Sequence, residues 1–106
     1  MKFLIDSIRE GDVVVGRNYD QDIPLGTVFT SITKCKVIGL DDEYKTIELG
    51  KVGSINLVLE KIDWYKPIEF VPGGHTAGLH FHGTGLNILR NNLKELREHE
   101  YLSIVA

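Results

Sequence analysis

The chain has 106 residues, and its 12 lysines and arginines against 15 aspartates and glutamates give a formal net charge of -3. Hydrophobic residues make up 42% and charged residues 25% of the sequence, values that are ordinary for a globular protein and that argue against disorder. A chain of this length can build one hydrophobic core, so we expect a single domain over residues 1–106. The acidic balance removes the electrostatic signature of a general nucleic-acid binder.

The cysteine content and the length of the apolar runs indicate the cellular compartment. Cys35 is the only cysteine, so the chain cannot form an intramolecular disulfide, and an oxidising compartment loses support. The apolar run at residues 3–5 ends at Asp6, and no stretch approaches the apolar length needed to cross a bilayer. We therefore expect a cytoplasmic protein without membrane contact. We expect Cys35 to be a small sheet residue rather than a catalytic thiol, because the sequence places no activating group beside it.

Short β-prone runs follow one another along the chain, with turn signals between them. The expected strands are residues 3–8, 12–16, 27–38, 45–51, 54–62, 68–71, 78–82 and 101–105, and the expected turns are residues 9–11, 23–26, 39–42 and 72–74. Alternation directs one set of side chains inward, namely Ile55, Leu57, Leu59, Leu79, Phe81, Leu102 and Ile104. Many short strands with regular turns favour a barrel or a sandwich.

One helix is predicted at about residues 86–98, before a closing strand at about residues 101–105. A leucine stripe with helical spacing carries this prediction, and its members are Leu86, Leu89, Leu93 and Leu96. Thr84 or Asn87 is a candidate cap for the start of the helix. Because a small barrel needs its ends filled, the stripe is expected to cover an open barrel end rather than to bind a partner.

Four segments of the chain, taken in order, form a pattern. Residues 13–17 (VVVGR) and 23–26 (IPLG) are followed by residues 74–83 (GHTAGLHFHG) and then by the final strand. These segments resemble the second domain of translation GTPases such as elongation factor Tu, with its Gly-Arg strand, Ile-x-x-Gly turn and Gly-acidic-Asn-Val-Gly segment. The resemblance implies an all-β fold, a small closed antiparallel β-barrel, as a freestanding domain. The phosphate-binding loop of a GTPase is absent, so nucleotide hydrolysis is not expected.

The resemblance also implies a binding surface. In the elongation factor the barrel contacts neighbouring domains, and the loop before the strand equivalent to residues 79–82 helps to hold the aminoacyl end of tRNA. This chain has His75 and Thr76 where the family has an acid and an asparagine, and His82 where the family has an arginine. We expect a non-catalytic binding module that uses His75, Thr76, His80 and His82 to contact a protein partner or an RNA end.

Arg17 and Trp64 are two further candidate binding residues. Trp64 and Tyr65, followed by Lys66 and Pro67, would form an exposed aromatic patch for a base or a protein, although a tryptophan in a small domain more often closes the core. Arg17 lies beside Tyr19 and the loop at residues 18–22, and it leaves the same two alternatives open.

The histidines are also the only local concentration of metal-capable ligands. On a strand, His80 and His82 would lie on one side about 6.6 Å apart, from roughly 3.3 Å per residue, and His75 could approach from the turn. A solvent-facing role opposite Leu79 and Phe81 is favoured over a metal site, so no metal and no cofactor are predicted. A metal-dependent enzyme using His75, His80 and His82 is kept as an alternative.

No catalytic residue is predicted. The carboxylates at residues 41–43 and at Glu98 and Glu100 are interpreted as solvated turn and helix-end charges, because no histidine, nucleophile or cavity is tied to them by the sequence. A freestanding acidic chain without a catalytic constellation is also compatible with a small bacterial immunity protein that neutralises a toxin, since an acidic surface can block a basic nuclease. The oligomeric state is left open.

Overall fold

The computed structural model describes residues 1–40, 43–64, 66 and 68–106. The elements in chain order are β1 (Lys2–Arg9), β2 (Val13–Asn18), β3 (Ile23–Pro24), β4 (Val28–Leu40), β5 (Glu43–Asp63), β6 (Phe70–Val71), β7 (Thr76–Thr84), α1 (Leu86–Lys94) and β8 (Glu100–Val105). The carboxylates of Asp41 and Asp42 and the predicted patch residues Tyr65 and Pro67 lie outside the described residues.

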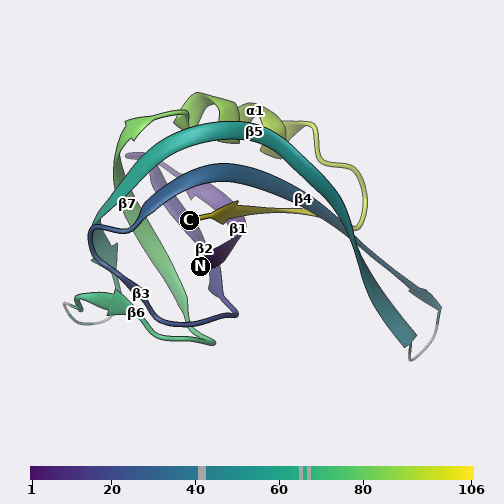
Figure 1. Cartoon of the computed structure of the whole chain (residues 1–106), viewed down its shortest axis with the longest axis horizontal. Coiled ribbons are helices and arrows are strands. Elements are labelled where there is room, and N and C mark those ends of the chain that lie inside the picture. Colours follow the sequence, from purple (N-terminus) through teal and green to yellow (C-terminus); the bar gives the residue numbers. More distant parts are fainter. Residues whose placement is uncertain (41–42, 65, 67) are drawn as a thin grey trace.

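Six strands form a closed barrel in the order β1-β2-β7-β5-β4-β8, and β1 closes it by pairing with β8. Every pair of neighbours in this order is antiparallel. Figure 1 shows β4 and β5 as two long curved ribbons over the barrel, while β3 and β6 form a separate small sheet at one end. The predicted fold class, a small closed antiparallel β-barrel with one helix, is confirmed.

The core lies inside the barrel, and it is made by the alternating side chains that the sequence predicts. The side chains of Ile55, Leu57, Leu59, Leu79, Leu102 and Ile104 are buried, and Phe81 packs against the core while partly exposed. Phe81 also meets Phe29 edge to face, with 5.7 Å between the ring centroids, a favoured geometry for aromatic pairs. The predicted inward faces are therefore confirmed, and the neighbouring positions face outward.

The two strands predicted at residues 45–51 and 54–62 are one continuous strand, β5. Gly50 accommodates the irregularity between them, because it has a φ of +94° and lies where the β4–β5 register shifts. Such a bulge bends a strand without ending it. Gly50 and Gly53 therefore lie at a bend within β5 rather than in a turn between two strands.

The helix α1 is shorter than predicted, because it ends at Lys94 instead of about residue 98. Its cap is Gly85, with a φ of +106°, and not Thr84 or Asn87; no side chain caps it. Leu89 is buried, while Leu86, Leu93 and Leu96 are partly buried against the core. The leucine stripe therefore faces the barrel.

Beyond the helix, the chain is turned back toward β8 by a local hydrogen bond. The backbone N–H of Arg97 donates to the carboxylate of Glu100 at 2.8 Å, and His99 takes a φ of +66°. At the other side of the helix, the guanidinium of Arg90 forms an ion pair with Asp12, which joins α1 to the turn between β1 and β2. The first contact lies in the connection between α1 and β8, and the second ties α1 itself to the barrel.

The strands β4 and β5 extend past their neighbours. β8 pairs with β4 only at residues 31–36, and β7 pairs with β5 only at residues 56–63. The remaining hairpin, residues 37–40 and 43–51, projects from the barrel at the right of Figure 1, and we call it the arm. Four of its large hydrophobic side chains are exposed, namely Ile38, Tyr44, Ile47 and Leu49. The arm was not anticipated as a projection from the sequence.

Candidate functional site

The barrel end where β2 finishes and β7 begins brings together several of the predicted binding residues. Arg17 on β2 lies directly across from Thr76 on β7 in the antiparallel ladder. The backbone N–H of Asn18 donates to the carbonyl of His75 at 2.9 Å. Arg17, His75 and Thr76 therefore occupy neighbouring positions, although about 60 residues separate β2 from β7 in the sequence.

Asn18 holds this end together, and the sequence analysis missed it. Its side chain is fully buried, and Nδ2 donates to the carbonyls of Gln21 and Val71, both at 2.9 Å. Its Oδ1 accepts a hydrogen bond from the backbone N–H of Asp20 at 3.0 Å. A buried amide needs partners of this kind, so Asn18 fixes the β2–β3 loop against β6. An asparagine two residues after a glycine is typical of a turn. The sequence therefore does not indicate that Asn18 has a buried structural role.

Arg17 and Tyr19 form a pair on the surface of the barrel end. The guanidinium carbon of Arg17 lies 5.1 Å from the centroid of the Tyr19 ring, which is a cation–π contact. Tyr19 is 66% exposed. Beside the pair is a hollow of about 210 Å³, whose lining includes Leu4, Thr76 and Tyr101. The arrangement presents an aromatic face, a cation and an apolar floor to the solvent.

A larger hollow of about 580 Å³ lies next to this one, and we call it the outer groove. Strands β1, β8, β4 and β5 are successive neighbours in the barrel, and their outward side chains line it together with the β2–β3 loop. Its lining residues are Lys2, Leu4, Tyr19, Asp20, Cys35, Val37, Thr46, Tyr101 and Ser103. Because Leu4, Tyr19 and Tyr101 line both hollows, the outer groove continues to the Arg17–Tyr19 pair.

Trp64 and His75 extend the site on its other side. Their rings meet edge to face with 5.4 Å between centroids, and Trp64 is partly buried. Trp64 also lines a hollow of about 300 Å³ together with Leu25 and Ile68. Trp64 is therefore neither an isolated exposed ring nor a core residue, because it is partly buried and its ring packs against the exposed His75.

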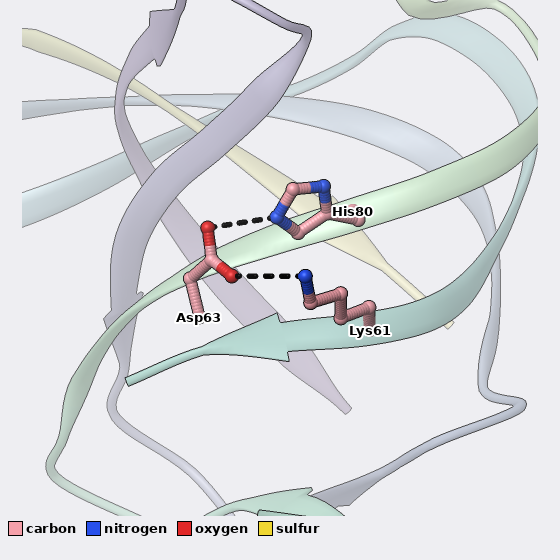
Figure 2. Close-up of polar contacts among 3 residues, drawn as sticks. All are labelled: Lys61, Asp63 and His80. Atoms are coloured by element: carbon pink, nitrogen blue, oxygen red, sulfur yellow. Dashed lines mark hydrogen bonds and ion pairs between the residues drawn. The ribbon is translucent and has the colours of Figure 1, made fainter. Parts of the chain in front are cut away.

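His80 and His82 lie further along β7, on the outer wall and away from that end. His80 Nε2 is 2.8 Å from Oδ2 of Asp63, and Figure 2 shows that Lys61 Nζ approaches the other oxygen of the same carboxylate, at 3.9 Å. His82 Nδ1 is 3.0 Å from Oε2 of Glu60. Both contacts join β5 to β7 across the ladder. The predicted outward orientation of these histidines, opposite Leu79 and Phe81, agrees with the structure.

The contact with His80 changes the acidity of Asp63. The hydrogen bond from His80 is the main reason that the pKa of Asp63 lies below its ordinary value of 3.8, and the positive charges of His80, Lys61 and Arg9 act in the same direction. Slight burial opposes the shift. Asp63 is therefore a carboxylate that stays ionised in the folded state at a lower pH than a free aspartate does.

The three histidines are not brought together around one point. His75 packs on Trp64, whereas His80 and His82 face Asp63 and Glu60 respectively. In the part of the chain that the structure describes, no three His, Cys, Asp or Glu side chains are grouped so that they could hold a metal ion. The geometry of the described residues gives no support to the histidine-based metal alternative.

The carboxylates at the helix end have structural partners. Glu100 accepts the N–H of Arg97, and its carboxylate lies 3.7 Å from Nζ of Lys34. The hydrogen bond from Arg97 is the main cause of a lowered pKa of Glu100. Oε1 of Glu98 lies 3.5 Å from Nε2 of His99. Their interpretation as helix-end charges is compatible with these contacts.

Comparison with known proteins found no match, whether to family models, to curated proteins or to solved structures. The described helix is too short and too polar to cross a membrane. The observations define a small closed antiparallel β-barrel. Its candidate site consists of the Arg17–Tyr19 pair, the His75–Trp64 pair and the outer groove.

Proposed function

We propose that the chain is a non-catalytic binding module that contacts a protein partner through the barrel end around Tyr19. The observation that carries this proposal is the Arg17–Tyr19 pair, which stands exposed beside the outer groove. Tyrosine, tryptophan and arginine are the residues most enriched among those that dominate binding energy at protein interfaces. This barrel end presents one of each, namely Arg17, Tyr19 and Trp64.

The charges around the site favour a protein over an RNA end. Asp6 lines the smaller hollow together with Arg17, and Asp20 and Lys2 both line the outer groove. A phosphate backbone approaching Arg17 would meet these carboxylates, and the chain as a whole is acidic. A protein surface with mixed charges can complement both the guanidinium and the carboxylates.

We infer that the barrel is a relative of the second domain of translation GTPases. The closed six-stranded antiparallel barrel is compatible with such a domain. The loop that leads into β7 is adjacent to Arg17 and Tyr19, and it corresponds by resemblance to the loop that contacts the aminoacyl end of tRNA in elongation factor Tu. On this proposal the chain keeps the position of the family's binding surface with different side chains.

Site-specific photocrosslinking in cells tests the proposed surface. A photoreactive phenylalanine analogue is placed at Tyr19, with a matched control at the exposed position Asn87 on α1. We expect a discrete protein adduct from position 19 only. The adduct should be lost in an Arg17→Ala background and kept in a Lys94→Ala background, because Lys94 lies on α1 and outside the site.

The outcomes of this experiment separate the alternatives. An adduct that disappears after ribonuclease treatment, and whose yield falls steeply with salt, would replace the protein partner by an RNA end. Equal adducts from positions 19 and 87, or an adduct that is indifferent to Arg17→Ala, would contradict the proposed surface.

A further inference from the structure

The outer groove has a floor that is buried although it lies on the outside of the barrel. Ser103 on β8 stands between Leu102 and Ile104, which are fully buried inside the barrel, so its side chain points outward. The outer face of an antiparallel sheet is ordinarily solvated, yet Ser103 is only 2% exposed. It is the most deeply buried of the residues that line the outer groove. Ser103 therefore marks the bottom of that groove.

The hydroxyl of Ser103 is not paired with any group in the part of the chain that the structure describes. The same residues contain no side-chain nitrogen or oxygen that is both fully enclosed and unpaired, so this hydroxyl keeps an opening toward the groove. A hydroxyl that loses its water without gaining another partner is destabilising. The floor therefore presents one unused hydrogen-bonding group to a molecule that fills the groove.

The walls above this floor are aromatic and aliphatic. Tyr101 comes from β8 and Tyr19 from the β2–β3 loop, while Leu4 and Val37 add aliphatic surface. At about 580 Å³ the groove falls within the size range of ligand sites, which are mostly apolar and contain a few placed polar groups. Aromatic rings pack well against other rings and against aliphatic side chains. These walls favour an aromatic occupant.

The charged groups of the groove lie at its rim and not at its floor. Lys2 and Asp20 are both exposed and carry opposite charges, and no other charged residue of the described chain lines the groove. A charged group that reached the floor would lose its water without meeting an opposite charge, which is unfavourable. The end of the occupant that reaches Ser103 is therefore neutral.

Tyrosine is the side chain that combines these properties. Its ring is flat and apolar, and its neutral hydroxyl lies at the far end of the ring, so that it reaches the floor first when the side chain enters. Tryptophan carries its N–H at the side of the ring, and phenylalanine has no polar group. An occupant without a hydrogen-bonding end would leave the hydroxyl of Ser103 unpaired after water is excluded.

We propose that the outer groove binds a tyrosine side chain of the protein partner, with its ring against Tyr19 and Tyr101 and its hydroxyl hydrogen-bonded to Ser103. This inference rests on the proposed function, and it names the chemical group that the partner inserts. The exposed Arg17–Tyr19 pair then contacts the surface of the partner around that tyrosine, since Tyr19 belongs to both the pair and the groove.

Two probes that differ by one hydroxyl test the proposal. N-acetyl-tyrosinamide and N-acetyl-phenylalaninamide are titrated separately into the whole chain, and affinity is measured from the chemical-shift changes of the backbone amides. We expect the tyrosine derivative to bind about fivefold more tightly, as one neutral hydrogen bond provides, and to shift the amides of Leu4, Cys35 and Ser103. In Ser103→Ala the two probes should bind equally. Ser7→Ala, which changes an exposed serine of β1 outside the groove, should keep the difference.

Protection of Cys35 supplies a second measurement on the unaltered chain. Cys35 is the only cysteine, and its partly exposed side chain lines the groove, so a bound phenol ring should slow its reaction with a maleimide. We expect the tyrosine derivative to protect Cys35 more than the phenylalanine derivative does at equal concentration. Equal affinities of the two probes for the original chain, a preference that survives Ser103→Ala, or no protection of Cys35 would overturn the proposal.

Failure of this inference and failure of the proposed function give different results. A chain that forms the protein adduct from position 19 but does not distinguish the probes binds its partner without inserting a tyrosine, which contradicts the inference alone. A chain that prefers the tyrosine derivative but forms no adduct has a groove for small phenols, which contradicts the proposed function and the protein source of the tyrosine.

Discussion

The buried side chain of Asn18 donates a hydrogen bond of 2.9 Å to the carbonyl of Val71, 53 residues further along the chain. This contact joins the end of β2 to β6, and Asn18 is therefore the residue on which the position of the Tyr19 loop depends. Both neighbours of Asn18 in the sequence, Arg17 and Tyr19, belong to the candidate site.

Replacing Asn18 should destabilise the fold. Asn18→Ala leaves the carbonyl of Val71 without its donor in a buried environment, so we expect a loss of about 2–3 kcal/mol in the free energy of unfolding. Urea denaturation followed by tryptophan fluorescence measures it. Asn91→Ala, an exposed helix position, should change stability by less than about 0.5 kcal/mol. Equal effects of the two substitutions would show that Asn18 does not organise the barrel end.

Gly85 should tolerate a side chain less well than Gly26 does. Both have positive φ, +106° and +87°, but a Cβ at Gly85 would lie 2.6 Å from Cγ2 and 3.0 Å from Cα of Ile55, whereas nothing lies within 4 Å of a Cβ at Gly26. Gly26→Ala should cost roughly 1–2 kcal/mol from backbone strain alone. Gly85→Ala should cost at least about 1 kcal/mol more, because β5 or α1 must shift. Thermal unfolding of both variants compares them directly.

The Asp63–His80 contact should contribute to stability in a defined pH range. Because the pKa of Asp63 is lowered in the folded state, its contribution is fully present above the ordinary value of 3.8 and is lost as the pH falls through the lowered value. Asp63→Asn should therefore lower the urea midpoint at pH 6, and the difference from the original chain should shrink below pH 3.8. Glu10→Gln, on the exposed β1–β2 turn, is the control and should show no such convergence. A constant difference across the titration would exclude the linkage.

Phe29 should be one of the residues on which the core depends most. It is fully buried and meets Phe81 edge to face, so Phe29→Ala removes a large apolar side chain and leaves a cavity that the barrel cannot fill. We expect a loss of about 3–5 kcal/mol. The neighbouring Val28 is 41% exposed, and Val28→Ala should cost less than about 1 kcal/mol. Chemical denaturation of both variants, with loss of near-ultraviolet circular dichroism as a second probe, checks the contrast.

The inward faces of the strands were predictable because side-chain alternation is a local property. Ile55 and Leu57 alternate with Ser54 and Asn56, and a strand places such residues on one face whatever its partner is. The leucine stripe of α1 was predictable for the same reason. The end of α1 was not, because it depends on the carboxylate of Glu100 reaching back to the N–H of Arg97.

The candidate site was predictable only in part, since it depends on which strands become neighbours. His75 and Thr76 were predicted together with His80 and His82, and Arg17 and Trp64 were predicted separately. The β2–β7 register places Arg17 beside Thr76, and a ring contact places Trp64 beside His75, whereas His80 and His82 lie further along β7. The outer groove combines Leu4, Cys35 and Tyr101, which are far apart in the sequence and adjacent only after β1, β8 and β4 pair. No local pattern marks such residues, because each one reads as an ordinary strand position.

The closure of the barrel by β1 and β8 also determines how the chain reaches its native state. The pairing of Lys2 with Val105 joins positions far apart in the sequence, and the β2–β7, β5–β7 and β4–β8 ladders are non-local as well, whereas β1–β2 and β4–β5 are hairpins. Most contacts in the fold are non-local. Proteins dominated by such contacts fold in milliseconds to seconds, because the entropy of large loops must be lost before the contacts are gained. During synthesis on the ribosome, β1 therefore cannot complete its pairing until β8 has been made.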